Sequence, residues 1–290
     1  MAKQVVQKCA KCCSAARAKL AELRELRDQA DVADAVYAHP PLPYIPGPPA
    51  DAAAAKYVKL TDAELADVGL TPRDLKIPLT NFQAAVYRRV DNDALLVAFR
   101  GTDKLTDVGA DLVQGLNLPS AYYSRAQGIA ARMSQALEEA GKPLPTFVGH
   151  SLGGGLASAA AWTSGAPAST FNAAGLSGMS KFLGATWTTL FGKAEEVTAM
   201  SVKGEVLTTA QKYGSLLIPE AYRTKDVVLD PPAEIGKKIL DRYGPDPSML
   251  DKAKAAAIRS GELHKMASVK ASLDKAIKGA EGQVQVACGS

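Results

Sequence analysis

The sequence has few residues of the kinds that build metal centres and disulfide frameworks, and it lacks a membrane-spanning run. It contains three histidines and four cysteines among 290 residues. No stretch approaches the roughly 20 consecutive apolar residues that a membrane-spanning helix needs. Cys9, Cys12 and Cys13 crowd together with no second Cys/His pair nearby, which favours reduced thiols over a zinc site or a disulfide framework. We therefore expect no bound metal and no cofactor.

The N-terminal segment lacks the features of a cleaved secretion signal. Residues 1–19 carry five basic residues and no acidic one, and no apolar core follows them. We expect a cytoplasmic protein by default, or one exported by a route that needs no cleaved signal. The net charge of +4 gathers at residues 3–19 and 252–278. Such ends suit solvated helix faces or a transient contact with an anionic membrane surface, and they predict neither a nucleic-acid partner nor a particular oligomeric state.

The order of the expected elements predicts an α/β protein. Residues 1–50 should form an N-terminal helix, periodic over 14–38, followed by a proline-rich strap at 39–49, with a single domain over 51–290. Strands are expected at 82–90, 94–99, 144–148, 169–173 and 197–202, and helices near 62–68, 121–140, 156–162 and 247–278. Strands that alternate with helices predict a mostly parallel sheet flanked by helices, with an N-terminal helical extension.

A Gly-x-Ser-x-Gly motif lies between an expected strand and an expected helix. The apolar run at 144–148 precedes it and the alanine-rich run at 156–162 follows it. This is the context of a nucleophile elbow, a sharp turn that exposes a serine hydroxyl above the edge of a sheet. Gly149 and Gly153 leave room for the strand and helix backbones to approach. The pattern predicts that Ser151 is a nucleophile.

The scarcity of histidine limits the choice of a general base. His39 precedes the nucleophile in the proline-rich strap, and His150 occupies the variable position of the elbow. We expect the side chain of His150 to point away from the path of the base. His264 alone follows Ser151, as the order Ser, acid, His of α/β-hydrolases requires, so the sequence predicts His264 as the base.

Three carboxylates are candidates for the acid that orients the base. Glu205 follows the expected strand at 197–202 through Lys203 and Gly204, which is the expected position for this residue. Asp226 precedes a short apolar run, and Asp230 follows it. Glu205 is favoured, and the two aspartates stay open as alternatives.

Two backbone N–H groups must stabilise the negative charge of the reaction intermediate. Leu152 directly follows the nucleophile and should supply one of them. Thr102 should supply the other, because it follows the expected central strand at 94–99 through Gly101, which lets the backbone approach a substrate.

Three motifs together resemble the class 3 lipases, which are α/β-hydrolases that cleave carboxylic esters of lipids. They are Phe99-Arg-Gly-Thr102, Asp107-Val-Gly-Ala-Asp111-Leu112 and Gly149-His-Ser-Leu-Gly-Gly154. The resemblance extends to bacterial phospholipase members, and it implies the same nucleophile, base and oxyanion donors. The candidate acid departs from the pattern, because the family more often has aspartate where this chain has Glu205.

These observations predict a serine carboxylic-ester hydrolase acting on lipids, of the lipase or phospholipase A type, through an acyl-enzyme on Ser151. A short-chain esterase or an acyltransferase on the same scaffold is an alternative, as is a non-catalytic α/β-hydrolase that binds a lipid or a protein. Residues 103–118 occupy the usual place of a lid in the family. Residues 176–193 form an amphipathic pattern that suits either a lid or the core.

Overall fold

The structure, a computed structural model, describes residues 2–38, 56–101, 120–175, 196–213, 221–244 and 248–289. The predicted strap at 39–49 and the two candidate lid segments at 103–118 and 176–193 lie outside the described residues.

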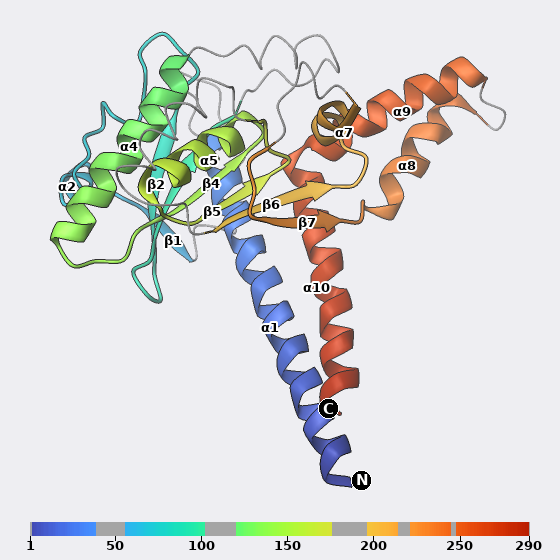
Figure 1. Cartoon of the computed structure of the whole chain (residues 1–290). Coiled ribbons are helices and arrows are strands. Elements are labelled where there is room, and N and C mark those ends of the chain that lie inside the picture. The colour runs from blue at the N-terminus through green and yellow to red at the C-terminus, as the bar shows by residue number, and fades with distance from the viewer. Residues whose placement is uncertain are drawn as a thin grey trace.

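One sheet forms the centre of the described chain, and its seven strands lie in sequence order (Figure 1). The strands are β1 (Tyr57–Lys59), β2 (Ala84–Arg89), β3 (Leu95–Phe99), β4 (Thr146–His150), β5 (Ala168–Phe171), β6 (Val197–Val202) and β7 (Lys225–Leu229). The pairs β1–β2 and β2–β3 are antiparallel, and every pair from β3 to β7 is parallel. The predicted α/β architecture with a mostly parallel sheet flanked by helices is confirmed.

Helices cover both faces of this sheet. They are α1 (Ala2–Ala35), η1 (Val36–Ala38), α2 (Asp62–Ala66), α4 (Ser120–Glu139), α5 (Leu152–Ser164), α7 (Val206–Tyr213), α8 (Ala233–Leu240), η3 (Asp241–Tyr243), α9 (Met249–His264) and α10 (Met266–Cys288). Helices α4 and α5 lie on one face, α1 and α10 lie on the other, and the α8–α9 pair projects from one side (Figure 1). None of the described helices is both long and apolar enough to cross a membrane.

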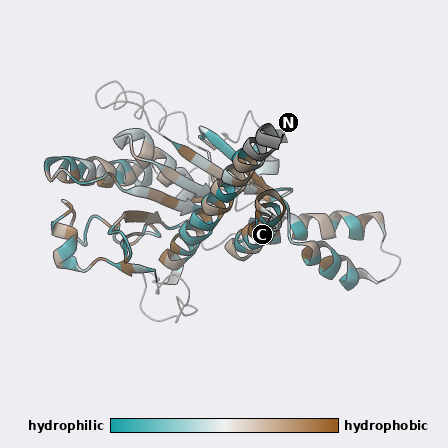
Figure 2. Ribbon diagram, turned by 90° about the horizontal axis from the view of Figure 1, so that it is seen from below, coloured by the Kyte–Doolittle hydropathy of each residue, from teal (hydrophilic) through white to brown (hydrophobic). Residues whose placement is uncertain are grey.

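The alternation of side chains along the strands divides the core into two halves. On β3, Val97 and Phe99 pack with α4 and α5, whereas Leu96 and Ala98 pack with α1 and α10. Successive strand residues point to opposite faces, so one strand serves both halves. Figure 2 shows apolar colouring on the strands of the central sheet.

Most local expectations agree with the structure. The helix expected near 62–68 is α2, which begins with a capping box of Thr61 and Glu64. The strands expected at 82–90 and 94–99 are β2 and β3, and they pair as an antiparallel hairpin. The short strands β1 and β7 and the helices α7 and α8 were not predicted, because three to eight residues carry too little periodicity to be recognised.

The N-terminal helix is a layer of the domain as well as an extension of it. Its apolar stripe, Leu23, Leu26, Ala30 and Ala33, is buried in the same cluster as Ala98 and other strand residues. The helix also begins at Ala2, well before the expected start at residue 14. Its N-terminal part runs beside α10 beyond the body of the domain, where both chain ends lie (Figure 1).

Ion pairs and a disulfide join α1 to α10. Arg24 contacts Glu281 at 2.8 Å, and Arg27 contacts Asp274 at 2.9 Å. Lys270 contacts Asp34 at 2.5 Å and Asp31 at 3.7 Å. Exposed pairs of this kind contribute about 0–1 kcal/mol each. They therefore matter more for the alignment of the two helices than for the stability of the folded protein.

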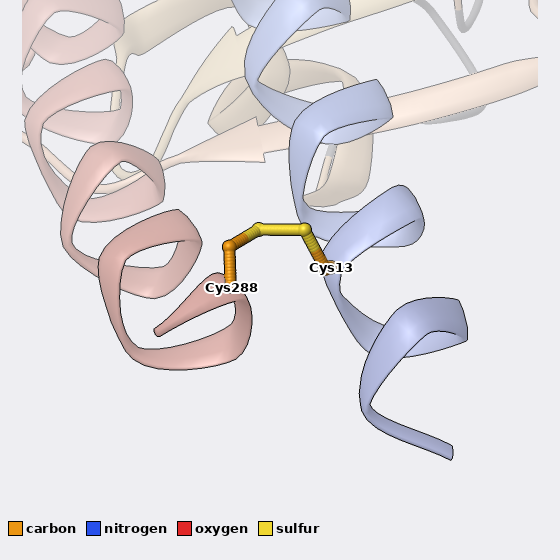
Figure 3. Close-up of a disulfide and its surroundings, with 2 residues drawn as sticks. All are labelled: Cys13 and Cys288. Atoms are coloured by element: carbon orange, nitrogen blue, oxygen red, sulfur yellow. A yellow bond between two sulfur atoms is a disulfide. The ribbon is translucent and has the colours of Figure 1, made fainter. Parts of the chain in front are cut away.

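The expectation of reduced thiols is wrong for Cys13, which forms a disulfide with Cys288 (Figure 3). The two residues lie 275 positions apart in sequence and meet because both helices pack on the same face of the sheet. Local sequence cannot reveal such a pairing. Cys12, next to the bridge, is an exposed free thiol.

We expect the disulfide to stabilise the folded protein, because it joins the two ends of the chain and restricts the unfolded state. Replacing both Cys13 and Cys288 by serine should lower the free energy of unfolding by about 2–4 kcal/mol. Urea denaturation without reductant measures the change, and Cys12→Ser is the matched control that should leave the stability as it is. Equal stability of the double variant and the wild type would contradict the role of the bridge.

Candidate active site

Ser151 lies in a strained turn between β4 and α5. Its backbone angles are φ 57° and ψ −124°, in a region that residues with a side chain rarely occupy. The backbone is held on both sides of the residue: the Ser151 N–H donates to the Phe171 carbonyl at 3.0 Å. The Ser151 carbonyl accepts from Gly154 at 3.0 Å and from Ala174 at 2.9 Å. These bonds keep the serine at the carboxyl ends of the parallel strands.

Glycines around this turn allow α5 to lie against the strands. A Cβ atom on Gly149 would lie 2.1 Å from the Gly153 carbonyl oxygen, and one on Gly153 would lie 2.1 Å from the Phe99 carbonyl oxygen. A Cβ on Gly154 would meet the Cβ of Ala173 at 2.6 Å. No side chain fits at these distances, so the glycines are a steric requirement of the fold.

The boundaries of the elbow differ from those predicted. The strand runs to His150, two residues further than expected, and α5 begins at Leu152 rather than at residue 156. Glycine is a poor helix former, so the run Gly153–Gly155 looked like a loop in sequence. Contact with β3, β4 and β5 compensates for that low propensity.

His264 ends α9 and is buried against Glu205. The His264 Nδ1 atom lies 2.6 Å from the Glu205 Oε2 atom, and both side chains are almost completely inaccessible. Glu205 lies between β6 and α7, at the carboxyl end of its strand. Its carboxylate also accepts backbone N–H groups from Leu207 at 2.8 Å and from Thr208, in the first turn of α7.

These contacts keep the buried carboxylate ionised. Burial by itself would raise the pKa of Glu205, but the hydrogen bond from His264, the charge of that ring and the hydrogen bonds from Thr208 lower the pKa below its usual value. The N-terminus of α7 also favours a negative charge at this point. An ionised Glu205 can therefore stabilise a positive charge on His264.

The two alternative carboxylates lie elsewhere. Asp226 pairs with Arg223 at 3.3 Å, and Asp230 lies 3.8 Å from Lys203. Both side chains are about half exposed or more. Among the described residues, Glu205 is the carboxylate that the structure brings to the His264 ring.

The other ring nitrogen of His264 has no partner in the described part of the chain. This Nε2 atom is buried and makes no hydrogen bond there. The backbone carbonyl of His264, in contrast, accepts from Asn172 Nδ2 at 3.0 Å and contacts His150 Nε2 at 2.6 Å. The backbone of His264 is thus held through its carbonyl, and its ring is held through Nδ1. The ring Nε2 atom is left to accept a proton.

The expectation that His150 points away from the base is wrong. Its ring centroid lies 4.9 Å from that of His264, and its Nδ1 atom lies 3.3 Å from the hydroxyl of Tyr37. Because β4 extends to His150, the side chain of this residue points to the face that α1 and α10 cover. The strand alternation would have shown this once the strand end was known.

One predicted oxyanion donor is placed by the structure. Leu152 is the first residue of α5, so its N–H precedes the first intrahelical hydrogen bond. Thr102 lies outside the described residues. Gly101, just before it, lies beside Ser151, because a Cβ on Gly101 would be 3.4 Å from the Ser151 Cβ atom.

Sequence reasoning missed Tyr37 and Asn172. The hydroxyl of Tyr37 accepts the Gly101 N–H at 2.9 Å, and Asn172 binds the carbonyls of Leu263 and His264. A polar residue directly after β5 could have suggested Asn172. No local signal distinguished Tyr37 from other residues of the N-terminal helix. The described residues contain no group of three or more His, Cys, Asp or Glu that could hold a metal ion.

A mostly parallel sheet, a serine in a strained strand-to-helix turn and a buried carboxylate–imidazole pair at the same edge define the α/β-hydrolase class. Comparison with known protein families narrows this class to one family. The model of the phospholipase-like family, described as a Tle-like phospholipase domain, matches residues 28–239. The chain belongs to this Tle-like phospholipase family.

Individual relatives either match a smaller part of this chain or have a low sequence identity to it. The extracellular phospholipase A1 of Serratia liquefaciens is 35% identical over 124 residues, which are 43% of this chain and 37% of that protein. The Rhizomucor miehei lipase–propeptide complex aligns with a TM-score of 0.45 and 13% identity over 72% of this chain and 68% of the other. A fungal lipase–inhibitor complex aligns with a TM-score of 0.42 and 14% identity over 83% and 96%.

Replacing Glu205 by glutamine should destabilise the protein in a pH-dependent way. Glutamine keeps one acceptor oxygen and places an NH₂ group against N–H donors, so we expect a loss of about 1–3 kcal/mol near neutral pH. The folded pKa of Glu205 is lowered, so the stabilisation by its ionised form is present above the unfolded pKa and is lost as the pH falls through the folded pKa. The gap between wild type and variant should therefore stay constant from about pH 7 to about pH 5 and narrow as the pH falls below about 4.5.

Urea denaturation at several pH values measures this gap. Asp230→Asn is the matched control, because that carboxylate is exposed and lies 3.8 Å from its nearest cation, Lys203. A pH-independent gap for Glu205→Gln, or an equal loss in the control, would contradict the assignment of a buried ionised carboxylate.

Proposed function

We propose that the chain hydrolyses carboxylic esters of phospholipids, as a phospholipase A, with Ser151, His264 and Glu205 as its catalytic residues. The observation that carries the proposal is the buried His264–Glu205 pair. The His264 ring lies 4.9 Å from the ring of His150, the residue before Ser151, and its Nε2 atom makes no hydrogen bond with the described residues. Membership of the Tle-like phospholipase family supports the substrate class. The name of the Serratia relative, phospholipase A1, supports it further, although the match spans little more than a third of that protein.

The reaction begins with attack by the Ser151 hydroxyl oxygen on the acyl carbonyl carbon. The hydroxyl proton passes to His264 Nε2, and ionised Glu205 stabilises the imidazolium that forms. The carbonyl oxygen becomes an oxyanion that accepts hydrogen bonds from the backbone N–H groups of Leu152 and Thr102. Collapse of this intermediate breaks the ester bond, and the lysophospholipid alcohol leaves with the proton from Nε2.

A water molecule completes the cycle. His264 Nε2 removes a proton from the water as its oxygen attacks the acyl-enzyme carbonyl, and the same oxyanion donors act again. The Ser151 oxygen then leaves and recovers the proton. The products are a fatty acid and a lysophospholipid, and the enzyme returns to its starting protonation state.

We also propose that the protein acts in an oxidising compartment. The disulfide of Cys13 and Cys288 supports this, since such bridges persist outside the reducing cytoplasm. The extracellular location in the name of the Serratia relative points the same way.

The nucleophile is tested with a fluorophosphonate probe and with vesicles of diacylphosphatidylglycerol. The wild type should bind the probe and release fatty acid, whereas Ser151→Ala should lose labelling and at least about 10³-fold in kcat. Ser158→Ala is the matched control, because that buried serine lies two turns further along α5 and donates to the Gly154 carbonyl at 3.0 Å. It should keep activity within about twofold.

Labelling that persists in Ser151→Ala would contradict the nucleophile assignment. A wild type that releases no acid from diacyl phospholipid, triglyceride or p-nitrophenyl butyrate would contradict the enzyme assignment and indicate a lipid-binding protein instead. Hydrolysis of p-nitrophenyl butyrate alone would contradict the phospholipid substrate and indicate a short-chain esterase.

A further inference from the structure

A chain of hydrogen bonds connects the segment before Thr102 to the backbone of His264. The Gly101 N–H donates to the Tyr37 hydroxyl at 2.9 Å. That hydroxyl lies 3.3 Å from His150 Nδ1, and His150 Nε2 lies 2.6 Å from the His264 carbonyl oxygen. These hydrogen bonds therefore connect the loop after β3, through η1 and the end of β4, to the junction of α9 and α10.

The donors and acceptors in this chain allow one assignment of protons for a neutral ring. A carbonyl oxygen only accepts, so His150 Nε2 must carry the hydrogen. The Nδ1 atom of a neutral His150 then accepts, and the Tyr37 hydroxyl donates to it. Because the Gly101 N–H donates to the hydroxyl oxygen, every bond points in the same direction along the chain.

The surroundings keep His150 in this neutral form. Burial, together with repulsion from a charged His264 ring, lowers the pKa of His150 to about 3. The ring also packs edge-on against Tyr37, with centroids 6.2 Å apart, so its orientation is restricted by packing as well as by its hydrogen bonds.

The His264 carbonyl is held from a second direction by the sheet. Asn172 Nδ2 donates to it at 3.0 Å, and Asn172 Oδ1 accepts from the Val202 N–H at 2.9 Å. Asn172 thus fixes the histidine relative to β5 and β6. What Tyr37 and His150 add is a link between that histidine and Gly101, which lies beside Ser151.

We propose that Tyr37 and His150 are positioning residues that set the spacing between the oxyanion-binding segment at Gly101 and the base His264. The inference rests on the proposed function, since it concerns the same reaction. In that reaction, negative charge develops beside Gly101 while positive charge develops on His264. Both groups must therefore keep their positions around Ser151 at the same moment.

Removing the Tyr37 hydroxyl leaves two buried polar groups, the Gly101 N–H and His150 Nδ1, without the partner they have in the wild type. The segment and the ring then shift to find other partners. The Tyr37 ring also lies 5.7 Å from the Arg100 guanidinium, and phenylalanine keeps a ring at that place. The loss of the hydroxyl therefore affects the geometry of the reacting groups more than the binding of the ester.

Tyr37→Phe should lower kcat on p-nitrophenyl butyrate by about 10- to 100-fold and leave KM within about twofold. Tyr87→Phe is the matched control. The Tyr87 side chain is buried in the same half of the core, and its hydroxyl makes no hydrogen bond with the described residues. Its kcat should equal that of the wild type.

A second pair of variants tests the same chain through His150. In His150→Gln the side-chain amide can donate to the His264 carbonyl and accept from Tyr37, whereas His150→Leu offers neither group. The glutamine variant should recover at least about tenfold in kcat over the leucine variant. Glutamine shares with histidine the ability to donate and accept these hydrogen bonds, and leucine does not. A higher kcat for the glutamine variant therefore shows that His150 acts through its hydrogen bonds and not only by filling space.

A wild-type kcat for Tyr37→Phe would overturn the inference, and so would equal kcat values for the glutamine and leucine variants. A rise in KM with no change in kcat would also overturn it, because it would place Tyr37 in substrate binding. The Ser151→Ala variant distinguishes a failure of the proposed function from a failure of the proposed roles of Tyr37 and His150. If it remains active the proposed function fails, and if it is inactive while Tyr37→Phe is normal only the present inference fails.

Discussion

The close approach of α5 to the ends of β3 and β4 is the constraint on which the rest of the site depends. There is no room for a Cβ atom at Gly149 or Gly153, and the short distance forces the chain to reverse within one residue. Ser151 therefore adopts a positive φ, a strain of about 1–3 kcal/mol for a residue with a side chain. Hydrogen bonds of its backbone with Phe171, Gly154 and Ala174 compensate for that strain. The hydroxyl is thus placed by the backbone, before any side chain of the site contributes.

The two helices on the opposite face of the sheet connect this turn to the rest of the molecule. Helix α1 ends next to Tyr37, and α10 begins two residues after His264, so the pair borders the site at one end. At the other end Cys13 and Cys288 tie the helices together (Figure 3). The short helix η1, directly after α1 in a region that by sequence looks like an extension, supplies the Tyr37 hydroxyl that lies between Gly101 and His150.

Features with a local signal were predictable, and features created by packing were not. The alternation of expected strands and helices predicted the sheet, and the elbow motif predicted the position of Ser151. A count of three histidines left one candidate base, and the structure brings that residue to Glu205. The disulfide, the orientation of His150 and the contact of Tyr37 all join segments far apart in sequence. Their partners are chosen by which helix covers which face, and a single sequence does not show this.

In the proposed mechanism, Ser151 carries the acyl group between two half-reactions. The most direct measurement is peptide mass spectrometry of protein mixed with p-nitrophenyl butyrate and quenched with acid during turnover. The account predicts a butyryl group on the peptide that contains Ser151, formed together with the first equivalent of nitrophenol. A burst of nitrophenol with the butyryl group on another residue, or turnover with no covalent adduct at any quench time, would contradict it.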